Sequence, residues 1–391
     1  MMDGHETIVR LEPNISAIAS AEWDACANPP GQIYHPFVSH AFLKALEDAR
    51  CVGEGTGWLP RHLVLEEAGG VIGGVAPCYV KGHSQGEFVF DHAWAQAYTQ
   101  AGGRYYPKLQ IAVPFTPVPG PRLLVRPGPG ARDNEQLLAT AAIEVARQNG
   151  LSSVHLTFLD AEAQQRLQPL GFLARTGYQF HWQNDGYASF DDFLATLASR
   201  KRKAVRKERI EALAPGIEIE HLTGDAITEA HWDVFYAFYV DTGNRKWGSP
   251  YLNRTFFALL GETMREQCVL VLAKRDGRYI AGALNMIGGD CLYGRYWGAT
   301  EHHPFLHFEV CYYQAIDYAI AHKLPRVEAG AQGDHKLARG YLPVETYSAH
   351  WLAEPGLHKA VERFLKQERR MVTENNAELT EMGPYRRSAE S

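Results

Sequence analysis

The sequence predicts an α+β (α/β) protein of two domains, each built on a mixed, mainly antiparallel sheet. With 391 residues, the chain is longer than one hydrophobic core usually organises. Its second half alternates strand and helix patterns in a regular order, and the first half has a degraded version of that order. No sequence repeat relates the halves. We therefore expect domains at residues 1–188 and 189–391.

The composition is that of a soluble globular protein, with 46% hydrophobic and 21% charged residues. A net charge of -6 gives no general basis for nucleic-acid binding, and no DNA partner is expected. No apolar stretch approaches the roughly 18 residues of a membrane span, and the N-terminus lacks a signal-peptide pattern. The six cysteines form no CxxC pair. These features predict a reduced, cytoplasmic protein.

The first half begins with helical patterns over residues 15–27 and 39–49, the second with Ser39 as a suitable N-cap. RHLVLEE and GGVIGGVAPCYVKG then predict paired strands across a Gly-rich turn. Residues 86–106 show no regular period, and the Pro-rich residues 113–130 predict a loop with at most an edge strand. A helix over residues 135–148 follows, then a strand, a short helix and another strand.

The second half begins with a basic helix over residues 189–214, where Ser189 and Asp192 resemble a capping box. A strand, IEIEHL, and two helices over 228–240 and 254–267 come next. VLVLAKRDGRYIAGALNMIGGDCLYGRYWGAT predicts three antiparallel strands joined by two tight turns. A helix, a short strand, a basic loop and a final strand complete the order.

This order resembles the Gcn5-related N-acetyltransferase (GNAT) fold, and the Lys-x-x-x-Gly-aromatic loop in KLPRVEAGAQGDHKLARGYLPVETYSAHW resembles the end of that superfamily. SRKRKAVRKER and the strand after it resemble the start of the second domain in Fem-type peptidyltransferases. Longer phrases, such as GRYWGATEHHPFLHFEVCYYQAIDYAI and RYYPKLQIAVPFTPVPGPRLL, resemble a bacterial family of predicted N-acyltransferases associated with peptidoglycan biosynthesis or recognition. The resemblance covers about residues 16 to 370.

The resemblance implies two tandem acetyltransferase-like domains, with acceptor recognition in the first and the acyl-transfer site in the second. The donor would be an acyl-CoA or an aminoacyl-tRNA used as a co-substrate, with no tightly bound cofactor. The acceptor would be a small-molecule or peptide amine, and tRNA would be a partner. Such a reaction needs a deprotonated amine, a stabilised oxyanion and a protonated leaving group.

In this architecture two neighbouring strands separate after a bulge, and the following helix directs its N-terminus at the donor. CLYGRYWGAT would be the first of those strands, with Tyr296, Trp297 and Gly298 binding the donor. Gly294 and Gly298 would permit the bulge, or they are ordinary strand glycines. Residues 299–307 lack the Gly-rich phosphate loop of acetyltransferases, as Fem-type enzymes also do. This departure weighs against acetyl-CoA, and both donors stay open.

The segment from Glu301 to Glu309 is the densest polar cluster, and we expect His307 or Glu309 to act as acid or base. Metal binding by His303 and His307 is an alternative, but no second metal motif supports it, and no metal is expected. Glu309 could instead be an ordinary carboxylate at a helix start.

Glu328 lies on RVEAGAQG, a strand that is otherwise apolar or small. Alternation would place Glu328, Gly330 and Gln332 on one face. A carboxylate in a central strand is costly unless it is paired. Glu328 is therefore predicted to be a catalytic residue or a buried ion-pair partner.

Two basic segments are candidate anion sites. The loop after that strand offers His335, Lys336, Arg339 and Tyr341 for donor binding, unless it is a solvated loop. The basic helix offers side chains for a polyanion such as tRNA, unless it is a solvated helix face. These side chains are Arg200, Lys201, Arg202, Lys203 and Arg206.

In the first half, charges and aromatic rings concentrate in an irregular segment that is a natural acceptor pocket. The predicted acceptor residues are Lys81, His83, Asp91 and Trp94, with a purely structural role as the alternative. The sequence thus predicts an N-acyltransferase that transfers the acyl group directly, because no Cys or Ser lies in a nucleophile motif. The competing hypothesis is a non-catalytic cleft protein that binds a cell-wall precursor or metabolite.

Overall fold

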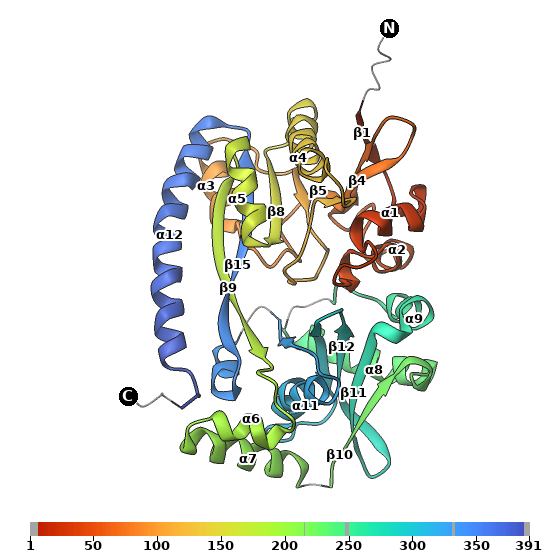
Figure 1. The fold of residues 1–391 in the computed structure, drawn as a ribbon, viewed down its shortest axis with the longest axis vertical. Helices are drawn as coiled ribbons and strands as arrows, with labels where there is room; N and C mark the ends of the chain where they lie inside the picture. The colour runs from red at the N-terminus through yellow and green to blue at the C-terminus, as the bar shows by residue number, and fades with distance from the viewer. Residues whose placement is uncertain (1–6, 215, 247–249, 331–332, 387–391) are drawn as a thin grey trace. The chain divides into compact units, whose positions relative to one another are not determined.

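The computed structural model describes residues 7–214, 216–246, 250–330 and 333–386 (Figure 1). These residues form two compact units. The first comprises the chain up to Gly177 together with Glu345–Thr373, and the second comprises Tyr178–Val344 together with the residues after Thr373. The boundary predicted after residue 188 therefore lies within the second unit. Strands β9 (Leu173–Gln183) and β15 (Leu342–Leu352) each begin in one unit and end in the other.

The first unit contains two sets of paired strands. One is an antiparallel sheet in the order β1 (Ile8–Glu12), β3 (His62–Glu66), β4 (Ile72–Ala76) and β7 (Leu124–Val125). The other has the order β2 (Trp58–Pro60), β5 (Cys78–Lys81), β6 (Lys108–Ile111), β8 (Ser153–Leu159) and β15. Within the second set, only β6 and β8 pair in parallel. The Pro-rich segment thus supplies an edge strand, as predicted.

Helices cover the strands of the first unit. They are α1 (Ser20–Ala27), α2 (His40–Asp48), α3 (His92–Gln100), α4 (Ala131–Gln148), α5 (Ala161–Leu167) and the start of α12 (Pro355–Glu381). The Ser39 side chain accepts a hydrogen bond from the Phe42 N–H, so the predicted N-cap is confirmed. Leu138 and Ala142 of α4 pack in the same core as Val154 and Leu156 of β8. Helix α4 connects the parallel strands β6 and β8.

The second unit has one mixed sheet in the order β10 (Glu218–Thr223), β11 (Cys268–Arg275), β12 (Arg278–Ile287), β13 (Cys291–Ala299), β14 (Arg326–Glu328) and the end of β9. Only β13 and β14 are parallel. A continuous helix over residues 306–321 connects them; it contains a π-helical turn, Glu309–Tyr313, and ends as α11 (Gln314–Ala321). Both units therefore contain one parallel pair joined by a helix. The predicted α+β class with mainly antiparallel pairing is confirmed.

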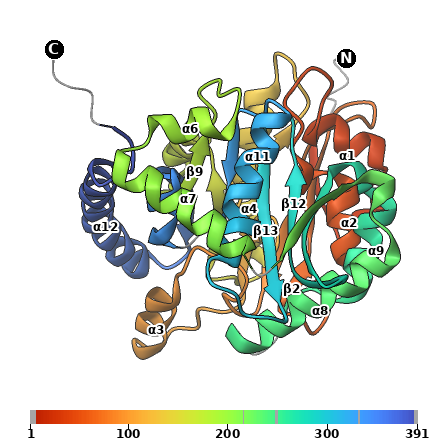
Figure 2. The same cartoon turned by 90° about the horizontal axis from the view of Figure 1, so that it is seen from below.

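Helices lie on both faces of the second sheet (Figure 2). On one face, α8 (Glu229–Lys246) and α9 (Arg254–Thr263) pack through Phe235, Phe238 and Phe257. On the other face, Val310 and Ile316 join a core with Ala283 and Leu292 of the strands. The helix that follows β13 is thereby fixed against the strand that precedes it.

Two local predictions in the second unit were wrong. The basic segment is two helices, α6 (Phe190–Thr196) and α7 (Ser199–Leu213), because Leu197 is buried in an extended conformation and forms a β-bridge with Tyr385. Strand β14 ends at Glu328, and Gly330 adopts a positive φ of 79°, so the predicted alternation does not reach Gly330. Gln332 lies outside the described residues.

Candidate active site

Strands β13 and β14 separate within the second unit. Their parallel ladder covers three residue pairs, from Cys291–Arg326 to Tyr293–Glu328, while β13 continues to Ala299. Strand β13 also carries a bulge, because Leu284 pairs with Tyr296 whereas the next residue, Asn285, pairs with Gly294. The bulge residue is therefore Arg295, beside the predicted Gly294. A strand that diverges from its neighbour in this way can offer backbone groups to a ligand.

A cavity of about 520 Å³ lies at the end of β13. Its lining residues are Thr242, Trp297, Ala299, Glu301, His302, His303, Pro304, Phe305, Leu306, His307 and Phe308. We call it the β13 pocket. The first turn of the helix over residues 306–321 forms part of its wall, and its N-cap residue Phe305 makes no side-chain capping bond. The first N–H groups of a helix favour an electronegative ligand group.

Three predicted site residues surround this pocket. Trp297 and His307 line it, with ring centroids 5.1 Å apart, and His335 lies 6.1 Å from His307. Phe308, which sequence reasoning missed, contacts the rings of both His307 and His335. Aromatic rings and imidazoles thus form a surface suited to an apolar or planar group, with His307 as a group that can exchange a proton.

The other predicted donor residues are placed differently. Tyr296 points to the opposite face of β13, where its ring packs against Tyr239 and Phe257. Gly298 lets the backbone of α8 approach, because a Cβ there would overlap the Phe238 carbonyl oxygen. Tyr341 is fully buried, and its hydroxyl donates to the Tyr312 carbonyl oxygen. These residues support the strand and helix that form the β13 pocket.

The basic side chains of the predicted donor loop are buried. Lys336 donates from Nζ to the Gly330 carbonyl oxygen at 3.0 Å, and burial lowers the pKa of its ammonium group to about 8. Arg339 forms two hydrogen bonds to the Glu208 carboxylate, at 2.9 and 3.1 Å, and stacks on the Phe308 ring at 3.4 Å. Arg339 therefore ties α7 to the wall of the β13 pocket. The alternative of a solvated loop does not fit the buried Lys336 and Arg339, whereas His335 is exposed.

Glu309 has a strong partner that the sequence did not reveal. Its carboxylate accepts hydrogen bonds from Arg209 at 2.9 to 3.2 Å and from Gln314 at 2.7 Å, and no part of the residue is exposed. Burial raises the pKa of Glu309 although Arg209 opposes the shift. Because the pocket lining ends at Phe308, this geometry favours the structural role for Glu309.

Glu328 lies where β13 and β14 separate. It accepts a hydrogen bond from Arg326 at 3.2 Å, and Nε2 of His181 is 3.9 Å from its other oxygen, Oε2. Burial raises the pKa of Glu328 to about 7, against the lowering effect of Arg326. Burial likewise lowers the pKa of His181 to about 3. Both predicted roles, ion-pair partner and titrating site group, fit these contacts.

The basic side chains of helix α7 differ in their ion pairing. Arg209 is engaged by Glu309 and Asp317, and Arg206 pairs with Asp191 at 2.8 Å. Within the part of the chain that the structure describes, no ion pair is recorded for Arg200, Lys201, Arg202 or Lys203. These four side chains are therefore the part of the predicted polyanion site that keeps its charge available.

Comparisons with known proteins show the family of this chain. A family model described as FemAB-like, peptidoglycan biosynthesis/recognition, matches residues 14–387. The chain belongs to the FemAB-like family. No curated protein compared with the chain matches it.

Solved structures similar to this FemAB-like protein span nearly all of it. FemX is 16% identical with a TM-score of 0.54, and the match covers 88% of this chain and 98% of that one. L-PGS from Bacillus licheniformis is 12% identical with a TM-score of 0.50 over 86% and 98%. A tandem GNAT protein from the clavulanic acid biosynthesis pathway is 13% identical with a TM-score of 0.45 over 90% and 99%. At such identities the likeness to FemX and L-PGS concerns the fold.

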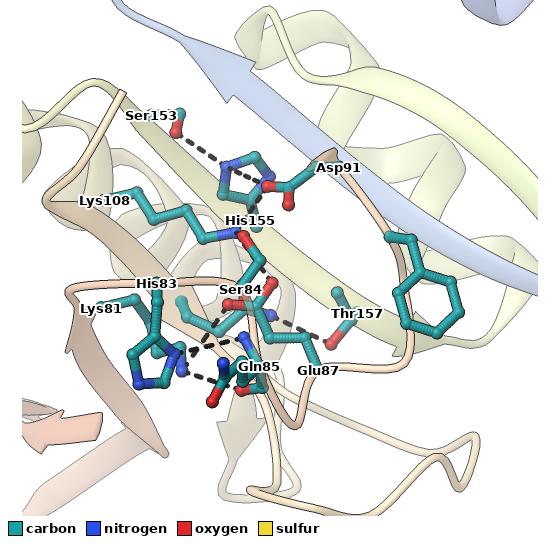
Figure 3. A network of polar contacts seen from close by, with 12 residues as sticks. Lys81, His83, Ser84, Gln85, Glu87, Asp91, Lys108, Ser153, His155 and Thr157 are labelled. Carbon is teal, nitrogen blue, oxygen red and sulfur yellow. Dashed lines mark hydrogen bonds and ion pairs between the residues drawn. The ribbon is translucent and has the colours of Figure 1, made fainter. Parts of the chain in front are cut away.

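In the first unit of this FemAB-like protein, two predicted acceptor residues lie in one buried polar cluster (Figure 3). Lys108 of β6 is its centre and donates to Ser84 at 2.8 Å, Glu87 at 2.8 Å and Asp91 at 2.5 Å. Lys81 lies 3.8 Å from Glu87 and 3.6 Å above the Trp58 ring. The cluster thus attaches the irregular segment after β5 to strand β6 of the sheet.

The other two acceptor candidates border this cluster. His83 hydrogen-bonds the Thr56 carbonyl oxygen at 3.1 Å, and Trp94 packs against His350 with centroids 5.0 Å apart. Sequence reasoning missed Lys108. The available signal was its charge, because Lys108 begins the strand KLQI within an apolar run. Sequence reasoning also missed the buried His155–His350 pair, whose Nδ1 atoms are 2.6 Å apart.

The cluster contains two lysine side chains and two carboxylates, so its opposite charges balance. Burial lowers the pKa of Lys81 to about 7 and raises that of Glu87 to about 7. Burial would also raise the pKa of Asp91, but the charge of Lys108 lowers it. Burial would lower the pKa of Lys108, but Glu87 and then Asp91 raise it. Among the described residues, Glu87 Oε1 and Asp91 Oδ1 lack a hydrogen-bond partner. Two carboxylate oxygens therefore remain able to accept a hydrogen bond.

The described residues contain neither a metal-ligand cluster nor a membrane-spanning helix. No three His, Cys, Asp or Glu side chains gather closely enough to hold a metal ion. No described helix is long and apolar enough to cross a membrane.

Proposed function

We propose that this FemAB-like protein is an N-acyltransferase that moves an acyl or aminoacyl group from an activated donor directly to an amine. The observation that carries the proposal is the separation of β13 from β14 beside the β13 pocket. A bulged strand, an adjoining helix start and an apolar cavity together can hold an extended donor and place its carbonyl beside strand N–H groups.

Each residue then has a proposed role. Trp297 and Phe308 would bind the donor against their rings, and His307 would exchange a proton with the amine or the leaving group. Glu309 and Arg209 would position the helix that carries His307, because the two side chains form an ion pair. In the first unit, the carboxylates of Glu87 and Asp91 would accept hydrogen bonds from a cationic acceptor.

The donor is either an acyl-CoA or an aminoacyl-tRNA. The unpaired charges of Arg200 to Lys203 favour a long polyanion, because each phosphate contact adds a salt-dependent contribution to binding. The absence of a Gly-rich loop at residues 299–305 also weighs against a bound pyrophosphate. We therefore favour aminoacyl-tRNA.

Donor consumption tests this function. Purified protein is mixed with radiolabelled acetyl-CoA or alanyl-tRNA and an amine panel that includes lysine, glucosamine and a peptidoglycan stem peptide with a free amine. We expect one of the two donors to lose its label when an amine is present. Ala299→Phe, which fills the pocket, should abolish this reaction. Ala131→Phe, in the first unit, is the size-matched control. If neither donor is consumed faster than in buffer, the proposal is wrong, and a non-catalytic cleft protein becomes the better description.

A further inference from the structure

Asn285 on β12 carries a buried amide with no partner. It is 1% exposed, and neither Oδ1 nor Nδ2 has a hydrogen-bond partner among the described residues. A buried amide of this kind is costly, and native proteins rarely leave both of its ends unpaired. An unpaired amide is tolerated where it serves a bound group.

The amide lies where β13 leaves β14. Asn285 is opposite Gly294, the residue just before the bulge, and the ladder between β13 and β14 ends one residue earlier, at Tyr293. A Cβ added to Gly294 would lie 3.5 Å from Asn285 Oδ1 and 3.4 Å from the Glu328 carbonyl oxygen. Position 294 is therefore bordered by two polar oxygen atoms.

The Asn285 amide lies on the strand face that carries the pocket residue Trp297. Asn285 and Ala283 are two residues apart on β12 and so share a face, and Ala283 is opposite the pocket residue Trp297. Two residues along a strand span about 7 Å. An extended ligand seated in the pocket could therefore reach the amide with one end.

We propose that the Asn285 amide binds the carbonyl end of the acyl donor, through a hydrogen bond from Nδ2 to the carbonyl oxygen. This inference rests on the proposed acyl transfer and adds a donor-binding residue to it. The shared ligand chemistry is the carbonyl group of an activated ester or thioester.

Two variants separate this role from a structural one. Asn285→Leu removes the amide at similar volume, and Gly294→Ala puts a methyl group beside Oδ1 at ordinary contact distances. Both should keep or raise the melting temperature and weaken donor binding about tenfold. Asn134→Leu is the matched control: its amide is buried and bonded to Glu67 at 2.6 Å, so this change should lower the melting temperature.

Acetyl-CoA and alanyl-tRNA are titrated separately, which tells the thioester from the ester donor. Wild type that binds neither donor contradicts the proposed function itself. Wild-type binding that Asn285→Leu and Gly294→Ala leave unchanged overturns only the role of Asn285. A fall in the melting temperature of Asn285→Leu as large as that of Asn134→Leu also overturns it, since the amide would then be satisfied within the fold.

Discussion

Glu309 and Glu328 are both buried carboxylates beside the β13–β14 region, yet their surroundings differ. Arg209 and Gln314 give Glu309 several hydrogen bonds, whereas Glu328 accepts one from Arg326 at 3.2 Å and has His181 Nε2 3.9 Å from Oε2. Burying a carboxylate costs free energy that only such contacts offset. Burial raises the pKa of both carboxylates, and that of Glu328 reaches about 7.

The pH dependence of stability tests this difference. The pKa of Glu328 rises from 4.5 to about 7 on folding, so the folded state binds the extra proton. As the pH rises from 4.5 to 7, the unfolding free energy of wild type should fall by up to about 3 kcal/mol relative to that of Glu328→Gln. Above pH 7 the difference between the two proteins should stay constant. Urea denaturation at several pH values measures it. Glu162→Gln, at an exposed carboxylate, is the control, and equal pH profiles would contradict the assignment.

The buried cluster of the first unit predicts a second residue-scale effect. Lys108→Met leaves Glu87 and Asp91 without their main cation, and breaking a buried ion pair costs about 3–5 kcal/mol. Lys44→Met breaks an exposed pair with Asp48 and should cost less than about 1 kcal/mol. Denaturation curves compare the two. Similar losses would show that the cluster is solvated.

Two of the predicted site residues, Trp297 and His307, line the β13 pocket because the order of strand and helix carries them there, and their roles stay predictions. The partner of Glu309 could not be predicted, because Arg209 lies 100 residues earlier and only tertiary packing brings them together. Asn285 was missed because nothing local distinguishes a buried amide from a surface one.

At the scale of elements, the pocket depends on how closely α8 approaches β13. Gly298 has no side chain, and the Phe238 carbonyl oxygen of α8 occupies the place of its Cβ. The helix and the strand are therefore held in contact, with Thr242 of α8 at the pocket wall. A larger residue at position 298 would push the helix away.

Gly298→Ala tests this close packing. Overlap with backbone atoms cannot be relieved by a side-chain rotation, so we expect a loss of about 1–3 kcal/mol or more. Gly130→Ala precedes α4, where an added Cβ meets nothing within 4 Å, and should leave stability nearly unchanged. Thermal unfolding measures both variants. If Gly298→Ala is as stable as Gly130→Ala, α8 does not rest on β13 as described.

Local pattern predicted the elements that depend on turns and alternation. The three-stranded meander β11–β13 followed from the turn residues near 276–277 and 288–290. Helix α3 was missed because its residues, His92–Gln100, bury only Trp94 and Ala95 and so show little periodicity. The break between α6 and α7 was missed because it arises from the burial of Leu197.

At the scale of the whole molecule, the net charge of -6 conceals a local concentration of basic side chains on α7. Replacing Arg200, Lys201, Arg202 and Lys203 by Gln should weaken alanyl-tRNA binding and reduce the slope of log K against log salt by roughly 3. The control replaces four exposed cations of α12, namely Lys359, Arg363, Lys366 and Arg370. Filter binding at several salt concentrations measures the slopes. Equal slopes for the α7 and α12 variants would show that α7 presents only a solvated face.

Donor binding at the β13 pocket is the central claim, and equilibrium binding tests it most directly. Acetyl-CoA and alanyl-tRNA are titrated into wild type, Ala299→Phe and Ala131→Phe at low and high salt. We expect one donor to bind wild type and Ala131→Phe equally, and Ala299→Phe at least about tenfold more weakly. Binding that is equal in all three proteins would place the donor elsewhere and contradict donor binding at the β13 pocket.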